Sequence, residues 1–264
     1  MTESGTENRF DLTGHVAIVT GASRGLGQYF ARALATAGAD LVITSRSVES
    51  LTVFQSEIES LGRRAVALPL DVREEESIAS MVAAAHEAYG KLDILVNNAG
   101  CNVREPALEV TWDNWNTIVN TNLRGQFFVS QHVARHMVER NYGRIVNIGS
   151  ITTEFGNAGM APYCASRGGV KQMTKSLADD WGRYGITVNC LSPGWFRTAQ
   201  NNALYENEKW VESIVDRTPL GRAGLPHDMD GTVVFLASEA SEYITGQTIL
   251  VDGGFTTGAT RLAP

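Results

Sequence analysis

The residues best suited to chemistry are a serine, a tyrosine and an arginine in one stretch of the chain. Ser150 follows a short apolar run, Tyr163 lies thirteen residues later at the start of a segment of helical period, and Arg167 follows four residues on. Reduction of a carbonyl by hydride needs a proton donor at the developing alkoxide and a second donor that fixes the carbonyl oxygen. A tyrosine that acts as a base near neutral pH needs adjacent positive charge. The pattern therefore predicts interconversion of a carbonyl and an alcohol, with the tyrosine as acid and base.

A glycine-rich turn lies near the N-terminus, after the β-rich run Val16–Thr20. A segment of helical period begins directly after the turn. Glycines let the backbone approach a pyrophosphate, and a helix N-terminus offers free N–H groups and the positive end of its dipole. The turn therefore predicts a dinucleotide site. Its candidate contacts are Gly21, Ser23, Arg24, Gly25, Leu26 and Gly27.

The end of the second predicted strand indicates which dinucleotide is bound. Sites for NAD usually carry an acidic residue there, which accepts a hydrogen bond from the ribose 2′-hydroxyl and would repel a 2′-phosphate. This sequence reads Thr44-Ser45-Arg46 at that point, without an acid. Arg46 and Arg24 could converge on one phosphate, which guanidinium groups bind well. NADP(H) is therefore the favoured cofactor and NAD(H) the alternative, with Ser45 and Arg46 as further contacts.

These residues need a scaffold, and the sequence predicts one because short β-rich runs alternate with longer segments of helical period. Such alternation predicts an α/β fold, a single-domain doubly wound (Rossmann) parallel sheet of about seven strands with helices on both faces. The predicted strands are Val16–Thr20, Leu41–Thr44, Ala65–Leu70, Leu92–Val96, Arg144–Ile148, Thr187–Leu191 and Thr248–Val251. The predicted helices cover residues 28–38, 48–61, 74–89, 110–140, 162–183 and 227–237.

Composition sets the remaining expectations for the 264 residues. Residues 1–12 are polar and are expected to form a flexible tail, and residues 13–264 a single domain with a small substrate-binding helical segment at about 195–225. A net charge of −7 argues against nucleic acid and anionic membranes as partners. No apolar run approaches the roughly 20 residues that span a bilayer. Three widely spaced cysteines favour reduced thiols and a cytoplasmic location.

Several ordered motifs together resemble the short-chain dehydrogenase/reductase family. They are the glycine turn, Asp71-Val72, Asn97-Asn98-Ala99-Gly100, Asn122, Ser150 with Tyr163, Pro193-Gly194 and Val251-Asp252-Gly253-Gly254. The resemblance covers about residues 10–255, and the stretch Tyr163–Asp252 is most similar to the sugar-acid branch, such as gluconate 5-dehydrogenase.

The resemblance implies roles for individual residues. Asn122, Ser150, Tyr163 and Arg167 would form the catalytic set, in which Asn122 holds a water in the proton path. Asp71 would accept a hydrogen bond from the adenine amino group, and Val72 would flank the ring. The further implied cofactor contacts are Asn98, Ala99, Gly100, Tyr163, Arg167, Pro193, Gly194 and Thr198.

Arg167 departs from the family pattern, which has a lysine at this position. A guanidinium keeps the positive charge and can bond two ribose hydroxyls, but it does not readily deprotonate. Lys171 is on roughly the same helical face but two turns from Tyr163, too far to take over simply. We therefore expect the catalytic set to act electrostatically, with a proton exchange that differs from that of the family.

The arginine also opens two alternatives. Halohydrin dehalogenases share the fold and a Ser–Tyr–Arg triad, but they lack an intact glycine turn, which this chain has. The second alternative is an NADP(H)-sensing protein with little catalysis. Hydride transfer with a panel of polyols and keto acids separates this sensing protein from an enzyme, and chloride release from a halohydrin would point to the dehalogenase.

The substrate side of the site is predicted from loops that follow strands. The segment after Pro193-Gly194 mixes aromatic and polar residues, among them Trp195 and Asn201, which suits a small polar carbonyl or alcohol substrate. Arg104 could bind a carboxylate, so a sugar acid is expected, with Arg104, Ser150, Trp195 and Asn201 as candidate contacts.

Two further features are interpreted as packing. His132 and His136 have the spacing of metal ligands on a helix, but no third ligand suggests itself, so no metal is expected. The segments 110–140 and 162–183 carry apolar residues on more than one face, which fits burial against partner subunits. Because the family usually forms tetramers through these helices, the resemblance implies a homotetramer.

Overall fold

The computed structural model describes residues 8–198 and 201–257, and within them seven parallel strands form one sheet. The strand order is β3-β2-β1-β4-β5-β6-β7. The strands are β1 Val16–Val19, β2 Asp40–Ser45, β3 Ala65–Pro69, β4 Ile94–Asn97, β5 Gly143–Ile148, β6 Ile186–Pro193 and β7 Thr248–Val251. The predicted doubly wound parallel sheet is therefore confirmed. Its central strands are buried along their whole length, because helices cover both faces.

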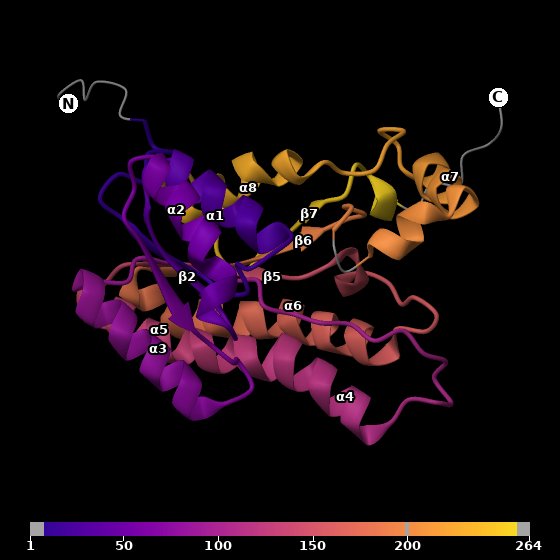
Figure 1. The fold of residues 1–264 in the computed structure, drawn as a ribbon, viewed down its shortest axis with the longest axis horizontal. Coiled ribbons are helices and arrows are strands. Elements are labelled where there is room, and N and C mark those ends of the chain that lie inside the picture. The colour runs from indigo at the N-terminus through magenta and orange to yellow at the C-terminus, as the bar shows by residue number, and fades with distance from the viewer. Residues whose placement is uncertain (1–7, 199–200, 258–264) are drawn as a thin grey trace.

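Helices cover both faces of the sheet (Figure 1). The α-helices are α1 Leu26–Thr36, α2 Thr52–Ser60, α3 Glu75–Tyr89, α4 Trp112–Val119, α5 Gly125–Arg140, α6 Ala161–Trp181, α7 Glu208–Arg217 and α8 Asp230–Ala237. Apolar side chains of α1, α2 and α8 form a core on one face, and those of α3, α5 and α6 form a core on the other. Helix α7 lies within residues 195–225, the segment that the sequence predicts to be helical.

The strand order reverses direction at β1, which pairs with β2 on one side and with β4 on the other. Because all the strands are parallel, their carboxyl ends lie along the same edge of the sheet. Ligands of such sheets bind beyond this edge, near the point where the order reverses. The glycine turn after β1 and the Asn97–Gly100 turn after β4 are therefore neighbours.

The predicted helix at 110–140 is wrong in one respect, because a π-helical turn over Asn120–Arg124 separates α4 from α5. Asn122 lies in this turn and is fully buried. Its side chain accepts a hydrogen bond from the Cys101 N–H (2.8 Å) and donates one to the Cys101 carbonyl (2.9 Å). π-turns often mark functional sites.

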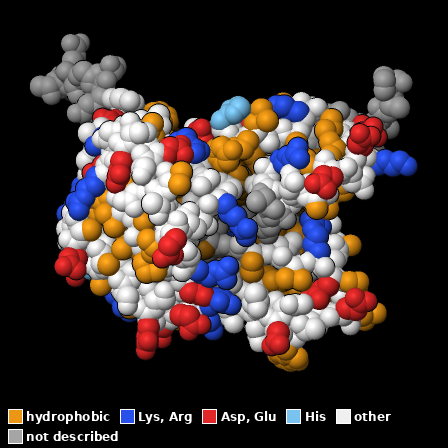
Figure 2. All heavy atoms as spheres, viewed as in Figure 1, with side chains coloured by type: hydrophobic (Ala, Val, Ile, Leu, Met, Phe, Trp, Pro, Cys, Tyr) orange, Lys and Arg blue, Asp and Glu red, His pale blue; other side chains and the backbone are white. Residues whose placement is uncertain are grey.

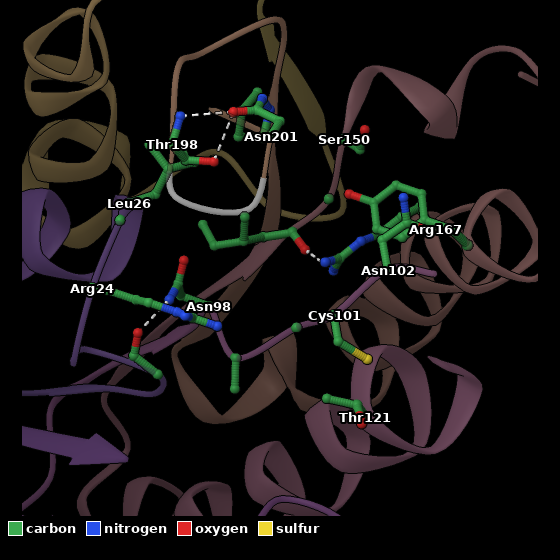
Figure 3. A pocket seen from close by; sticks show the side chains of 18 of the residues that line it. Arg24, Leu26, Asn98, Cys101, Asn102, Thr121, Ser150, Arg167, Thr198 and Asn201 are labelled. Atoms are coloured by element: carbon green, nitrogen blue, oxygen red, sulfur yellow. Dashed lines mark hydrogen bonds between the residues drawn. The ribbon is translucent and has the colours of Figure 1, made fainter. Parts of the chain in front are cut away.

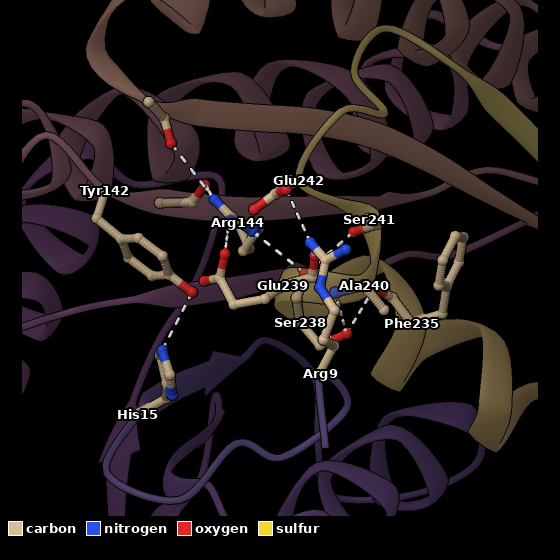
Figure 4. Close-up of polar contacts among 12 residues, drawn as sticks. Arg9, His15, Tyr142, Arg144, Phe235, Ser238, Glu239, Ala240, Ser241 and Glu242 are labelled. Atoms are coloured by element: carbon tan, nitrogen blue, oxygen red, sulfur yellow. Dashed lines mark hydrogen bonds and ion pairs between the residues drawn. The ribbon is translucent and has the colours of Figure 1, made fainter. Parts of the chain in front are cut away.

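The expected flexible tail at 1–12 needs a correction at its end, since Leu12 belongs to the core although residues 8–11 are exposed; residues 1–7 lie outside the described part. Leu12 is fully buried in the core. Arg9 forms an ion pair with Glu242 (2.8 Å) and donates to the Glu239 carbonyl (Figure 4). Arg144 of β5, which is buried, forms an ion pair with the Glu239 carboxylate (3.0 Å). The burial of Leu12 and the contacts of Arg9 thus join this end of the described chain to the domain.

Candidate active site

The glycine turn folds into a narrow cradle that a side chain at its key positions would fill. Gly21 and Gly25 have φ of +67° and +63°, a conformation that favours glycine. A Cβ at Gly27 would clash with the Gly21 carbonyl. Asn98 fixes the turn by donating to the carbonyls of Thr20 (2.9 Å) and Gly21 (3.1 Å). The predicted neighbours Asn98 and Gly21 thus hold each other in place.

Helix α1 begins directly behind this cradle, and its N-terminus suits an anion. Among the described residues no side chain caps its first turn, and that turn contains no acidic residue. Its first N–H groups are therefore available to a ligand, and the helix dipole adds positive potential. The cradle, the exposed N–H groups and nearby guanidinium groups fit the pyrophosphate of a dinucleotide.

A cleft of about 490 Å³ opens at the carboxyl edge of the sheet, beside the cradle. Lys and Arg side chains lie along the hollow in this face of the molecule (Figure 2). Arg24, Leu26 and Asn98 lie on one side of the cleft, and Ser150 and Arg167 on the other (Figure 3). The predicted residues that line it are Gly21, Ser23, Arg24, Gly25, Leu26, Ser45, Arg46, Asp71, Val72, Asn98, Ala99, Gly100, Arg104, Ser150, Tyr163, Arg167, Pro193, Gly194, Trp195, Thr198 and Asn201. Gly27 and Asn122 lie behind this lining.

Arg167 is a buried charge, with 5% of its surface exposed. Its Nη1 donates to the Ile148 carbonyl (2.7 Å), and its Cζ lies 5.0 Å from the centre of the Tyr163 ring. Gly100 leaves room for it, since a Cβ there would lie 2.5 Å from Nη2 of the arginine. The guanidinium is thus held against the tyrosine in the lining of the cleft, as the helical spacing predicts.

Ser150 and Asn122 are both fixed by backbone contacts. Ser150 caps a short 3₁₀ turn, and its Oγ accepts a hydrogen bond from the Thr152 N–H (3.2 Å). The Asn122 amide bonds both backbone groups of Cys101 and also donates to Ser166 Oγ (3.2 Å). Asn122 therefore supports the turn that follows β4, and its implied role in holding a water stays a prediction.

The segment after β3 contains a residue that the sequence reasoning missed. Arg73 lines the cleft and forms a two-pronged contact with the Asp71 carboxylate, with distances of 3.0 Å and 2.6 Å. These hydrogen bonds lower the pKa of Asp71, and the charge of Arg46 adds to the effect. A basic residue two positions after the acid was the sequence signal that could have identified the pair.

The predicted substrate residues have different surroundings. Arg104 is exposed at the cleft and forms no ion pair with any described residue. Trp195 packs edge-on against Trp210, with ring centres 5.0 Å apart. Asn201 accepts from the Thr198 N–H (2.7 Å) and donates to the Phe196 carbonyl, so the loop already uses both ends of its amide. Arg104 is thus the candidate that is free to bind a charged substrate.

One of the two histidines on α5, His136, forms a ring contact across two helices. His136 stacks on His86 of α3, with ring centres 4.3 Å apart. Burial lowers the pKa of His136, and the charge of His86 adds to this effect. In the described residues no three His, Cys, Asp or Glu side chains gather in the way a metal ion requires.

No described helix is long and apolar enough to cross a membrane.

Comparisons with known proteins agree with this geometry. A family model described as enoyl-(acyl carrier protein) reductase matches residues 21–256. Gluconate 5-dehydrogenase of Gluconobacter oxydans (strain 621H) is 43% identical over 247 residues, which are 94% of this chain and 96% of the relative. The 2-dehydro-3-deoxy-D-gluconate 5-dehydrogenase of Escherichia coli (strain K12) is 41% identical, covering 93% and 97% of the two chains.

Solved structures match over the same length. A gluconate 5-dehydrogenase from Burkholderia cenocepacia J2315 in complex with NADP and tartrate superposes with a TM-score of 0.93 at 40% identity, covering 96% of this chain and 99% of that one. A putative short-chain alcohol dehydrogenase from Sinorhizobium meliloti 1021 gives 0.92 at 47% identity, covering 94% and 99%. The chain belongs to the short-chain dehydrogenase/reductase family.

Proposed function

We propose that this protein is an NADP(H)-dependent oxidoreductase that interconverts an alcohol and a ketone on a sugar acid of the gluconate and 5-ketogluconate kind. The observation that carries the proposal is the cleft itself, which Ser150, Tyr163 and Arg167 share with an intact glycine cradle. The curated relatives with 36–43% identity are dehydrogenases and reductases of gluconate and its keto derivatives. They do not favour the dehalogenase alternative.

The residues of this chain divide the chemistry between them. Bound NADPH supplies the hydride. The Ser150 hydroxyl and the Tyr163 phenol donate to the substrate carbonyl oxygen, and the phenol transfers its proton as negative charge develops there. Arg167, held by the Ile148 carbonyl, stabilises the tyrosinate that remains and is placed to bond ribose hydroxyls. Tyr163 must regain its proton before the next turnover. Because the guanidinium of Arg167 does not readily release a proton, the proton must reach Tyr163 by a route that does not use Arg167 as a relay.

The preference for NADP(H) is assigned to Arg24 and Arg46. Both are exposed at the cleft and form no ion pair with any described residue, so both are free to bind a 2′-phosphate. Ser45 ends β2 beside them, where an NAD site would carry an acid. The structures of relatives with bound NADP, at 35–40% identity, support this choice.

Arg104 is proposed to bind the substrate carboxylate. A two-pronged contact between arginine and a carboxylate contributes about 1.5–3 kcal/mol, so Arg104→Ala should raise the KM for 5-ketogluconate by about tenfold to a hundredfold. It should leave the KM for an uncharged polyol ketone unchanged. Arg183→Ala, an exposed arginine outside the cleft, is the matched control. An unchanged KM for the acid in Arg104→Ala would remove this role.

The wild-type enzyme tests the whole proposal in a substrate panel with NADPH and NADH. Consumption of NADPH with keto-aldonates supports it. Halide release from a halohydrin would instead support a dehalogenase. Tight NADPH binding without turnover of any substrate would support a sensing protein.

We also propose that the protein is a homotetramer and that it is located in the cytoplasm. Large apolar side chains on α4 support an interface, since 83% of Trp112 and 40% of Trp115 are exposed in the single chain. The net charge of −7 supports a small-molecule enzyme without nucleic-acid partners. Light scattering at micromolar concentration should give four times the chain mass, and a monomer would refute the assembly.

A further inference from the structure

Arg73 is held in one orientation by the carboxylate that the family resemblance assigns to adenine. Its Nε donates to Asp71 Oδ1 (3.0 Å) and its Nη2 to Oδ2 (2.6 Å), while its backbone N–H also donates to Oδ1 (3.0 Å). Two parallel bonds between a guanidinium and a carboxylate fix the plane of both groups. Arg73 therefore presents a flat, preorganised surface.

The segment that carries this pair is anchored on the π turn. Arg124 donates to the Arg73 carbonyl (2.8 Å). Gly125 packs so closely on Val72 that a Cβ there would lie 2.7 Å from the Val72 carbonyl oxygen. About 38% of the Arg73 side chain is nevertheless exposed, and it lines the cleft. The guanidinium is thus fixed without being covered, as a contact surface for a ligand needs to be.

The Asp71–Arg73 pair lies beside the end of β2. Ser45 pairs with Pro69 in the sheet, and the Leu70 N–H donates to the Ser45 carbonyl (2.8 Å). Arg46 follows Ser45 directly, and its charge acts on Asp71. Three arginines line this end of the cleft. Arg73 forms an ion pair with Asp71, whereas Arg24 and Arg46 form no ion pair with any described residue.

This difference separates two kinds of recognition. An unpaired guanidinium keeps its N–H donors and its charge for a phosphate, whereas one held edge-on by a carboxylate keeps its flat faces open for stacking on an aromatic ring. Nucleic-acid bases stack on arginine planes in this way in other proteins. The end of the cleft beyond β2 and β3 therefore offers the Arg73 plane for a purine ring. It offers the separate charges of Arg24 and Arg46 for the 2′-phosphate on the ribose that carries this purine.

We propose that Arg73, held by Asp71, stacks on the adenine ring of the dinucleotide, and that Arg24 and Arg46 alone set the preference for NADP(H). The inference rests on the proposed dinucleotide function and adds a residue to it. Asp71 then supports dinucleotide binding chiefly by holding Arg73. The hydrogen bond between Asp71 and the adenine amino group contributes less to binding than the family resemblance implies. Arg73 contributes equally to the binding of NADPH and NADH, because both carry the same adenine.

Calorimetric titration of the full-length protein with NADPH and with NADH tests whether Arg73 binds the adenine and whether Arg24 and Arg46 bind the 2′-phosphate. Arg73→Ala should weaken both dinucleotides by the same factor, about fivefold to tenfold, and should weaken AMP similarly. Arg46→Ala should weaken NADPH and leave NADH unchanged. Arg64→Ala, an exposed arginine outside the cleft, is the matched control. Unchanged binding in Arg73→Ala, or a loss confined to NADPH, would overturn the inference.

Two replacements separate stacking from charge and from a general loss of folding. Arg73→Tyr supplies a neutral ring and should bind NADH within about twofold of wild type, whereas Arg73→Lys keeps the charge and should bind as weakly as Arg73→Ala. Rescue by lysine and not by tyrosine would show an electrostatic role and refute stacking. An analogue with hypoxanthine in place of adenine should bind within about twofold of NADPH. Failure of the wild type to bind any dinucleotide would overturn the proposed function itself, not this division alone.

Discussion

Removal of the Arg167 charge is the sharpest perturbation of the proposed chemistry. Arg167→Met keeps a long, flexible side chain in the buried site and deletes the guanidinium beside Tyr163. The Cζ atom lies 5.0 Å from the centre of the tyrosine ring. Taking that distance as the charge separation and an effective dielectric constant of about 20, the attraction to a tyrosinate is about 3 kcal/mol. The variant should therefore lose about a hundredfold in kcat.

The assay is NADPH oxidation by 5-ketogluconate across a range of pH, with single-turnover measurements to isolate the chemical step. Lys175→Met, which removes an exposed charge from the same helix outside the cleft, is the matched control and should leave kcat unchanged. NADPH binding and thermal unfolding of each variant show whether the site is intact. A methionine variant with wild-type kcat would refute the electrostatic role.

Arg167→Lys separates charge from proton exchange. A lysine keeps the positive charge, so kcat should stay within about tenfold of wild type. It also restores a group that can release a proton, so the pH profile of kcat should change. An identical rate and an identical pH profile would remove the idea that the arginine alters proton exchange.

Two further variants test the packing around the site, and a third tests a half-buried histidine between α3 and α5. Gly100→Ala places a methyl group 2.5 Å from Nη2 of Arg167, so kcat should fall by about tenfold or more in steady-state turnover, while circular dichroism shows an unchanged fold. Gly27→Ala crowds Asn98, 2.6 Å from the added carbon, and should abolish NADPH binding in a calorimetric titration. Burial lowers the pKa of His136 from 6.5, so the unfolded chain takes up the proton first as pH falls. Stability is then lost below about pH 6.5, and His136→Gln should flatten the unfolding free energy between about pH 7 and 5.5.

The sheet was predictable because its signals are local. A continuous apolar run such as Val16–Val19 indicates a strand buried on both faces, whatever surrounds it. The helical spacing of Tyr163 and Arg167 also places their side chains together without further information. Glycines at 21 and 25 follow from the conformation that the turn requires.

The differences arise where distant residues decide the local structure. The π turn at Asn120–Arg124 accompanies hydrogen bonds between Asn122 and Cys101, which no local pattern reveals. Leu12 belongs to the core because the chain before β1 packs beside α1, although the surrounding residues are polar. Asn201 has the chemistry of a substrate ligand, but its loop uses both ends of its amide.

Hydride transfer can be followed directly with NADPH that carries deuterium at its reactive carbon and with 5-ketogluconate as acceptor. With wild-type enzyme we expect one deuterium on the new carbinol carbon of the product, and in Tyr163→Phe we expect loss of this product although NADPH still binds. A product without the label, or labelled product formed at an undiminished rate by Tyr163→Phe, would contradict the proposed chemistry.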